Sequence, residues 1–191
     1  MRPRADMTLD PDIPLVERIL AGEQQAFARL IDRHKSYAYT IAYKILLNRP
    51  EAEEVAQDAF IKAYHHLADF NRQAKFSTWL YRIVFNTAIT YKRKHRHTFQ
   101  GLEHTVVEYE QRADGPVEKR DKERYLQLAL QRLNESDRTA MTLFYLDELS
   151  LEEIASIMEL QANTVKVRIH RARQRLADEL KRILNQEALT L

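Results

Sequence analysis

The sequence predicts an all-α protein of two small helical domains joined by a flexible linker, the second containing a helix-turn-helix. Residues with high helix propensity are abundant, whereas the 191 residues include only three glycines and five prolines. Apolar residues recur at helical spacing in two long stretches. Between these stretches, residues 98–118 lack that periodicity and form a connection longer than is usual inside a compact domain.

Composition excludes several classes of protein. No apolar run approaches the roughly 18 residues that a membrane helix needs, and the first residues lack the apolar core of a secretion signal. With 30% charged residues and no cysteine, we expect a soluble, cytoplasmic protein without membrane insertion, disulfides or a thiolate zinc site. The scarcity of glycine also argues against a Gly-rich phosphate loop. We expect no cofactor and no metal ion.

The first domain is predicted over residues 13–97, after an N-terminal tail of residues 1–12. Two helices are expected first, because apolar residues recur at helical spacing, and Gly22 marks the turn between them. An Asn-Arg-Pro break follows, and its Pro50 suits the first turn of a third helix. Residues 68–77 are then predicted to form a loop before a fourth helix.

The fourth helix combines aromatic and basic side chains. Its sequence, KFSTWLYRIVFNTAITYKRKHRH (75–97), holds the only tryptophan and no carboxylate. One helical face carries a ring, hydrogen-bonding groups and cations, namely Trp79, Arg82, Asn86, Thr90 and Arg93. Single-stranded DNA needs such a surface, because unstacked bases pack on rings and phosphates attract cations. For Trp79 itself, a core anchor is the alternative.

The second domain, predicted over residues 119–187, contains the sequence LSLEEIASIMELQANTVKVRIHRARQRL (149–176), which has the pattern of a helix-turn-helix. Ser150 and Glu153 predict a capping box at the start of its first helix. After a break, Asn163 or a neighbour can cap the second helix.

The second helix of this motif is apolar on one face and basic on the other. Residues 163–182 contain seven Lys or Arg against two acidic residues. A helix of this width fits the DNA major groove, where Arg and Lys reach guanine edges or phosphates. A solvated amphipathic helix is the alternative, but the capped partner helix favours DNA binding.

Carboxylates gather at the start of the third helix, within the sequence EAEEVAQDAF (51–60). Acidic residues suit the positive end of the helix dipole, which accounts for the first of them. A helical hydrolase that uses Glu53, Glu54, Asp58 and His65 is another interpretation. The adjacent His65 and His66 do not share a helix face, which weakens that interpretation.

Three motifs in this order resemble those of bacterial RNA polymerase sigma factors of the two-domain, extracytoplasmic-function group: EAEEVAQDAFIKAYHHL, FSTWLYRIVFNTA and the helix-turn-helix sequence. The resemblance spans residues 15–184. It implies an alternative sigma factor, not an enzyme, with domains like sigma regions 2 and 4. The implied partners are core RNA polymerase, promoter DNA in duplex and single-stranded form, and an anti-sigma factor.

The resemblance also implies three sets of site residues. Core polymerase would be bound by an exposed aromatic residue within a charged rim, formed by Glu54, Gln57, Asp58, Phe60 and Lys62. The minus-ten element would be recognised and melted by Phe70, Asn71, Lys75, Phe76, Trp79, Arg82, Asn86, Lys92 and Arg93. In that set, the loop before the fourth helix would hold a flipped base. The minus-thirty-five element would be bound by Asn163, Thr164, Lys166, Val167, Arg168, His170, Arg171 and Arg173.

The sequence departs from the pattern of the family at two positions in the second helix of the helix-turn-helix, which we call the recognition helix. Many relatives have Gly where this chain has Asn163, and a small polar residue where it has Val167. Because Val167 can contact a thymine methyl group, we expect an altered minus-thirty-five preference.

Two further interpretations stay open at this point. A helix-turn-helix regulator that never contacts polymerase would bind a palindrome as a dimer and leave the acidic helix without a role. A helical adaptor with only protein partners would show no salt-dependent affinity for DNA.

Overall fold

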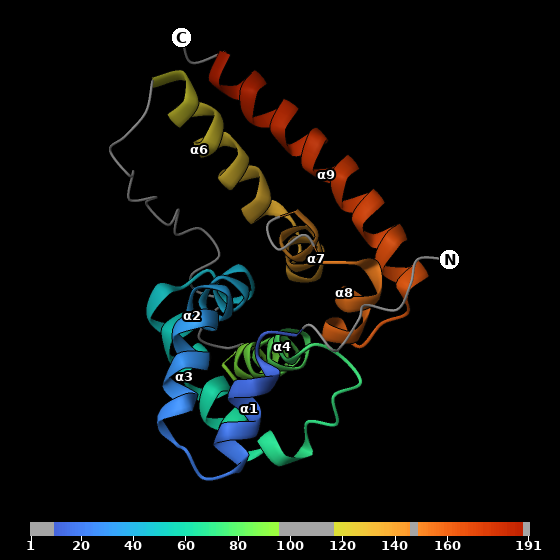
Figure 1. The fold of residues 1–191 in the computed structure, drawn as a ribbon. Coiled ribbons are helices and arrows are strands. Elements are labelled where there is room, and N and C mark those ends of the chain that lie inside the picture. The colour runs from blue at the N-terminus through green and yellow to red at the C-terminus, as the bar shows by residue number, and fades with distance from the viewer. Residues whose placement is uncertain (1–9, 96–116, 146–148, 189–191) are drawn as a thin grey trace.

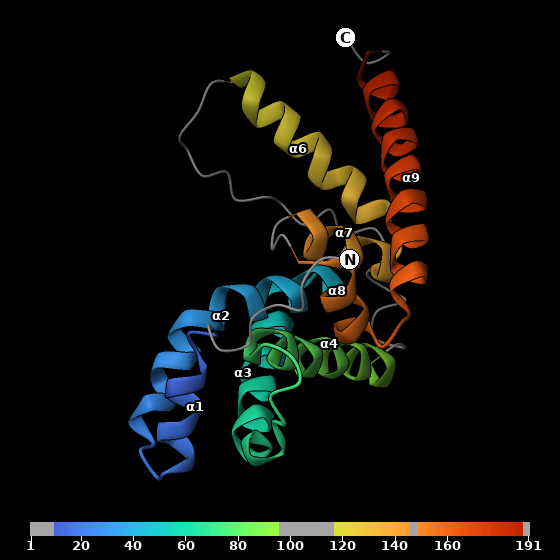
Figure 2. The ribbon, with the colours of Figure 1, turned by 45° about the vertical axis from the view of Figure 1, so that its right-hand side comes forward.

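The computed structural model describes residues 10–95, 117–145 and 149–188, and within these ranges every regular element is a helix (Figures 1 and 2). The first domain contains α1 (Ile13–Leu20), α2 (Gln25–Leu46), α3 (Arg49–His65), the 3-10 turn η2 (Leu67–Asp69) and α4 (Phe76–Lys94). The second contains α6 (Val117–Arg132), α7 (Glu135–Tyr145), α8 (Leu151–Met158) and α9 (Ala162–Ala188). The predicted class, two small helical domains, is confirmed. The predicted linker lies outside the described residues except where α6 begins.

Local sequence signals set several of the helix ends. Gly22 takes a φ of 99° between α1 and α2, in the left-handed region that favours glycine. The Asn48 side chain caps α3 by accepting a hydrogen bond from the Glu51 amide at 3.2 Å. The predicted capping box of α8 is also present, between Ser150 and Glu153.

One expected boundary differs from the structure. Helix α4 begins at Phe76, so the loop before it is shorter than expected, and the buried Phe76 ring belongs to the helix. Helix α9 begins at Ala162, so its cap position falls on a neighbour of Asn163, the second of the two possibilities that the sequence offered.

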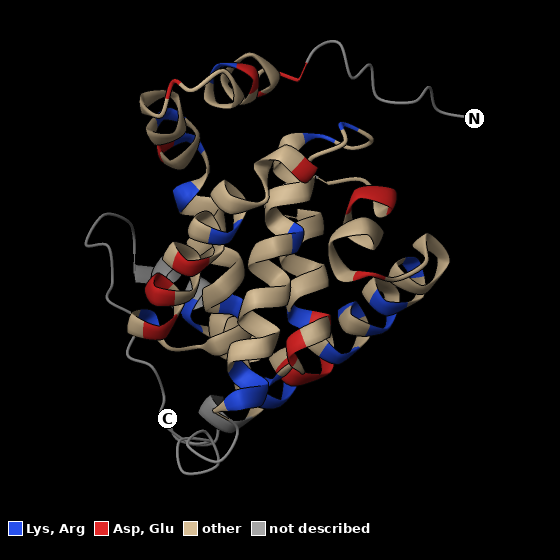
Figure 3. Ribbon diagram, turned by 90° about the horizontal axis from the view of Figure 1, so that it is seen from below, with Lys and Arg blue, Asp and Glu red and all other residues tan. Residues whose placement is uncertain are grey.

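The core of the first domain lies between α2, α3 and α4. Its large, fully buried side chains come from all three helices and include Leu30, Ile41, Ile45, Val55, Phe76, Leu80 and Val84. Each such side chain contributes about 1.5–3 kcal/mol by leaving water. Seen from below, the central helices carry few charged residues, and most charges lie on the outer helices (Figure 3). None of the described helices has the length and apolar character of a membrane span.

Helices α6 and α9 run alongside each other, and α7 and α8 pack at one end of this pair (Figure 1). The buried Arg138 of α7 donates to the backbone oxygens of Gln131 and Leu133, at 3.0 and 2.9 Å, and so closes the end of α6. It also donates to the backbone oxygen of Lys44 in the first domain. Burial lowers the pKa of Arg138 to about 10, which leaves it protonated at neutral pH.

The two domains pack against each other in this structure. Helix α8 lies on α4, and α7 lies on α2 (Figure 2). A continuous group of buried apolar residues runs from the first domain into the second. The neighbouring Lys44 is also buried at this contact, and burial, followed by the charge of Arg138, lowers its pKa. Two cations therefore lie close together where the domains meet.

Candidate nucleic-acid and polymerase interfaces

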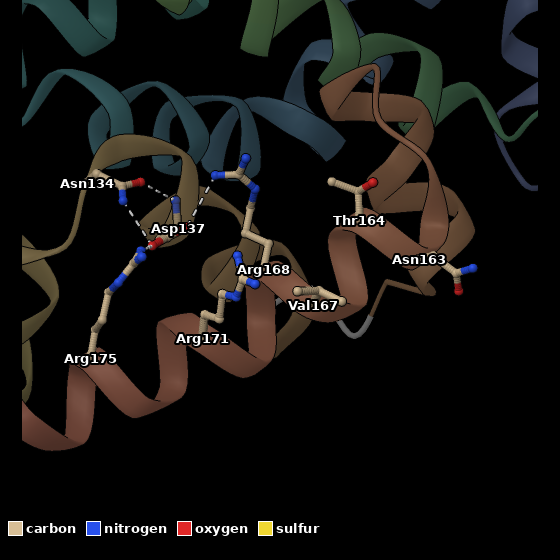
Figure 4. Close-up of a pocket in the computed structure, with 8 residues that line it drawn as sticks. All are labelled: Asn134, Asp137, Asn163, Thr164, Val167, Arg168, Arg171 and Arg175. Carbon is tan, nitrogen blue, oxygen red and sulfur yellow. Dashed lines mark hydrogen bonds and ion pairs between the residues drawn. The ribbon is translucent and has the colours of Figure 1, made fainter.

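Helix α9 presents the predicted minus-thirty-five residues on its first turns. Seven of the eight are exposed, and Arg168 is half-buried. Val167, which is 47% exposed, is a large apolar side chain that faces solvent among polar ones. A pocket of about 520 Å³ lies between this face and the start of α7, and it is lined by Asn134, Asp137, Asn163, Thr164, Val167, Arg168, Arg171 and Arg175 (Figure 4).

Asp137 fixes the position of α9 relative to α7. This carboxylate is only 2% exposed, and it receives hydrogen bonds from Asn134 at 2.9 Å, from Arg168 at 3.2 Å and from Arg175 (Figure 4). Arg171 lies between these two arginines and forms no ion pair within the part of the chain that the structure describes. The arrangement therefore presents Arg171 as an available cation, whereas Arg168 is already engaged.

Asp137 and Arg175 were not among the residues predicted from the sequence. Arg175 lies seven residues after Arg168, two helical turns along the same face, and this spacing could have identified the pair. The predicted contact residue Arg173 lies elsewhere, with its guanidinium 5.8 and 5.1 Å from the ring centres of Phe144 and Tyr145. Arg173 thus stacks on α7 with a cation–π geometry.

The predicted minus-ten aromatic residues form one cluster at the start of α4. The ring centres of Phe70 and Phe76 are 5.7 Å apart, and both lie near Trp79, at 5.3 and 5.7 Å. Phe70 and Phe76 are buried, whereas Trp79 is half-buried. In this arrangement Phe70 and Phe76 have no surface for a base, because their rings fill core positions and support Trp79 from beneath.

The polar face of α4 is bound by carboxylates of the second domain. Glu159, in the turn of the helix-turn-helix, accepts two hydrogen bonds from Arg82, at 3.0 and 2.8 Å, and one from Asn86 at 3.0 Å. Lys75 pairs with Glu153 at 2.9 Å. Bonds from Asn86 and Arg82 lower the pKa of Glu159, as expected for a carboxylate stabilised in its charged form.

A third contact of this kind joins Lys92 to Glu135 of α7, at 2.7 Å. The predicted residues Asn71 and Arg93 are exposed and form no ion pair within the described ranges. Four of the nine predicted minus-ten residues are therefore held by the second domain. In this structure the polar ends of these side chains are thus paired with residues of the second domain.

The structure contradicts one feature expected of α3, the exposure of the Phe60 ring. Glu54, Gln57, Asp58 and Lys62 are exposed, but Phe60 is only 7% exposed, so the expected exposed aromatic anchor is absent at that position. Helix α3 packs against both α2 and α4 and so buries a wide apolar face, to which Phe60 belongs together with Val55 and four alanines.

Two other apolar side chains are exposed beside the carboxylates of α3. Ile61 is 56% exposed and Tyr64 is 37% exposed. Ile61 follows Asp58 by three residues, which places it on the same helix face. The Tyr64 ring contacts Phe27 of α2 edge to face, with the centres 4.9 Å apart. Ile61 and Tyr64, and not Phe60, are thus the large apolar side chains exposed on this helix.

The acidic residues of α3 lie in no cluster of metal-ligating side chains among the residues that the structure describes. Within residues 10–95, 117–145 and 149–188, no three or more metal-ligating side chains come together. The hydrolase interpretation, with Glu53, Glu54, Asp58 and His65, therefore has no such cluster in the described structure.

A basic helix in a helix-turn-helix, together with another helical domain that carries an aromatic and basic helix, is typical of a two-domain DNA-binding protein. Residues 30–98 match the family model for Sigma-70 region 2, and residues 123–176 match that for Sigma-70, region 4. The chain is 37% identical over 177 residues to the ECF RNA polymerase sigma factor SigW of Bacillus subtilis (strain 168), covering 87% of this chain and 95% of that one. It is 34% identical over 186 residues to the ECF RNA polymerase sigma-E factor of Escherichia coli (strain K12), covering 91% and 96%.

The chain belongs to the extracytoplasmic-function (ECF) family of RNA polymerase sigma factors, the alternative sigma factors that direct transcription initiation. Its fold is similar to that of CnrH, solved in complex with the cytosolic domain of CnrY, with a TM-score of 0.66, 26% identity and coverage of 89% of this chain and 97% of that one. The sigma factor RpoE of Bartonella quintana, solved with the anti-sigma factor NepR, shares the fold with a TM-score of 0.66 at 23% identity, covering 81% and 96%.

Proposed function

We propose that this sigma factor binds core RNA polymerase through the exposed face of α3 and reads promoter DNA with both domains. Residues 13–97 then recognise and melt the minus-ten element, and residues 119–187 bind the minus-thirty-five element. The observation that carries the proposal is the exposed basic face of α9, which Asp137 holds at a fixed angle to α7. A rigidly held helix can enter the major groove in one register.

The second domain contacts duplex DNA in this mechanism. Arg171 and Lys166 are exposed cations that suit phosphates or guanine edges, and Val167 suits a thymine methyl group. Phosphate contacts position the complex on the duplex, while base contacts select the site.

The first domain captures unpaired bases. Trp79 supplies a ring surface supported by two buried phenylalanines, and the loop of residues 71–75 holds the flipped base. Once the domains separate, Arg82 and Asn86 become available to this strand. Core polymerase performs the chemistry, so the protein acts in the cytoplasm as a binding factor and not as an enzyme.

We call the form in which the two domains pack against each other the closed arrangement. In this form core polymerase can reach α3 more readily than α4. The surface on α3 stays exposed while Glu159 covers the polar face of α4. Core polymerase can therefore bind first and then hold the two domains apart. We also propose an anti-sigma factor as a regulatory partner, supported by the related structures with bound partner proteins.

Binding to core polymerase tests this proposal. The double variant Asp58→Arg, Ile61→Glu changes two exposed residues, so it is expected to fold while binding core polymerase at least tenfold more weakly. The control is Asp32→Arg, which changes an exposed carboxylate on α2. If wild type and both variants bind core polymerase equally, α3 is not the docking surface. If folded wild type does not bind at all, the proposal is wrong.

A further inference from the structure

Helix α4 receives its N-terminal cap from a distant residue. The first amides of a helix need acceptors outside the helix, and Lys75, at the cap position, supplies no side-chain oxygen. Instead, the Phe76 amide donates to Oδ2 of Asp10 at 2.8 Å. Because Phe76 directly follows the loop that precedes α4, this bond fixes the point at which the loop ends and the helix begins.

Asp10 is itself held in place by the segment that we call the strap, residues 10–12. Oδ1 of Asp10 accepts a hydrogen bond from the Asp12 amide at 3.0 Å. Asp12 is buried and bound by His34 at 2.7 Å and by Arg33, which also donates to the Pro11 carbonyl at 3.1 Å. Burial acts to raise the pKa of Asp12, but the bonds from His34 and Arg33 outweigh it, so its pKa is lowered. The strap is thus anchored on α2.

The anchor of the strap also reaches the aromatic cluster at the start of α4. The other ring nitrogen of His34 lies 3.1 Å from the Tyr81 hydroxyl, and its ring centre lies 5.6 Å from that of Phe76. Phe76 in turn packs against Trp79. The strap therefore positions Phe76 in two ways. Asp10 binds its backbone amide, and His34, which Asp12 binds, contacts its ring.

The loop of residues 71–75, which lies between Phe70 and Phe76, also contacts helix α1. Arg72 has a φ of 59°, in the left-handed region, which costs a non-glycine residue about 1 kcal/mol. Its guanidinium pairs with Glu17 of α1 at 2.9 Å. A strained loop keeps one conformation only if its surroundings fix it, and the Asp10 cap is one of those constraints.

We infer that Asp10 is a positioning residue for minus-ten recognition, which acts through Phe76 on the loop of residues 71–75. This inference rests on the proposed function, because that loop is proposed to hold the flipped base. A base pocket is useful only when its walls stay within a fraction of an ångström of the productive geometry. Without Asp10, the Phe76 amide loses its acceptor, and the loop and the ring cluster both become less ordered.

The test uses core polymerase bound to wild type, Asp10→Ala, Asp10→Asn or the control Asp32→Ala. The probes are one promoter fragment, defined by the 5′ ends of transcripts that the wild-type holoenzyme makes, and the same fragment with unpaired bases at the minus-ten element. Because the chain has one tryptophan, the emission and acrylamide quenching of Trp79 report on the ring cluster directly in the free protein.

We expect Asp10→Ala to weaken binding of the unpaired probe about fivefold, the usual scale for a lost cap. Binding of core polymerase and of isolated minus-thirty-five duplex should stay within twofold of wild type, and Trp79 should become more accessible to acrylamide. Asp10→Asn, which keeps one acceptor oxygen, should lie between wild type and Asp10→Ala. The control should match wild type.

Two results would overturn the inference: equal binding of the unpaired probe by wild type and Asp10→Ala, or equal losses on every probe and on core polymerase. If Asp10→Ala unfolds, the comparison of Asp10→Asn with wild type, by probe binding and Trp79 quenching, decides. A wild-type protein that binds core polymerase but not the unpaired probe would instead refute the proposed minus-ten function itself.

Discussion

Replacing Glu159 should open the closed arrangement of the two domains. The Glu159 carboxylate accepts three hydrogen bonds from Arg82 and Asn86 across the contact between α8 and α4. Its side chain is 51% exposed and that of Arg82 is 49% exposed, so water screens the ion pair strongly. We therefore expect Glu159→Ala to cost the closed form about 1 kcal/mol, near the upper limit for an exposed pair.

A loss of about 1 kcal/mol shifts the ratio of open to closed molecules about fivefold. The chain has no cysteine, so fluorescent labels can be placed on single cysteines introduced at Ser36 of α2 and Ala177 of α9. Both positions are exposed. Single-molecule energy transfer between these labels then counts closed and open molecules. Glu152→Ala is the matched control, because Glu152 is exposed on α8 and has no ion pair in the described ranges.

Charge exchange provides the sharpest version of this experiment. Arg82→Glu should open the protein, and adding Glu159→Arg should restore part of the closed population, which a double-mutant cycle measures as coupling. Equal closed populations for Glu159→Ala and Glu152→Ala would show that Glu159 does not stabilise the closed form. The absence of coupling in the exchanged pair would show the same for its contact with Arg82.

The remaining predictions concern pH and the recognition helix. The pKa of Glu159 is lowered from 4.5 in the closed form. Its contribution to closure is therefore present above pH 4.5 and is lost as the pH falls through the lowered value. The labelled protein should open on acidification, and Glu159→Gln should reduce this pH dependence. Asp137→Ala leaves two arginines without their shared buried acceptor and should lower the free energy of unfolding by about 2 kcal/mol in urea titrations, against no change for the exposed Asp178→Ala. Arg171→Ala should weaken promoter duplex binding and reduce the slope of the logarithm of the binding constant against the logarithm of the salt concentration by about one. Arg182→Ala should change neither quantity.

Features that depend on neighbouring residues were predictable from the sequence. The capping box of α8 needs only Ser150 and Glu153, and the turn between α1 and α2 needs only Gly22 at positive φ. The apolar side of α4 also followed from spacing alone, since Leu80 and Val84 are fully buried. In each case the physical cause lies within one or two helical turns.

The burial of Phe60 was not predictable in the same way. Carboxylates precede it in the sequence, and the resemblance to sigma factors implied an exposed ring on α3. The helix instead packs against both α2 and α4, and Phe60 lies in the apolar face that these two contacts bury. The width of an apolar face depends on the number of neighbouring helices, which a single helix does not reveal.

Contacts between distant segments were equally inaccessible. Glu159 lies 77 residues from Arg82, and Asp10 lies 66 residues from Phe76. Charged residues are common on both domains, so any of them could have paired with the predicted DNA-binding cations. Only the packing of α8 on α4 selects Glu159, and only the path of the strap over α2 brings Asp10 to the start of α4.

The most direct test of the central claim is transcription from genomic DNA fragments by core RNA polymerase, with and without this protein, followed by mapping of the transcript 5′ ends. We predict new start sites that share sequence elements near positions minus ten and minus thirty-five, and their loss with Asp58→Arg, Ile61→Glu. If folded wild-type protein adds no start site to those of core polymerase alone, the assignment of promoter recognition to these two domains is contradicted.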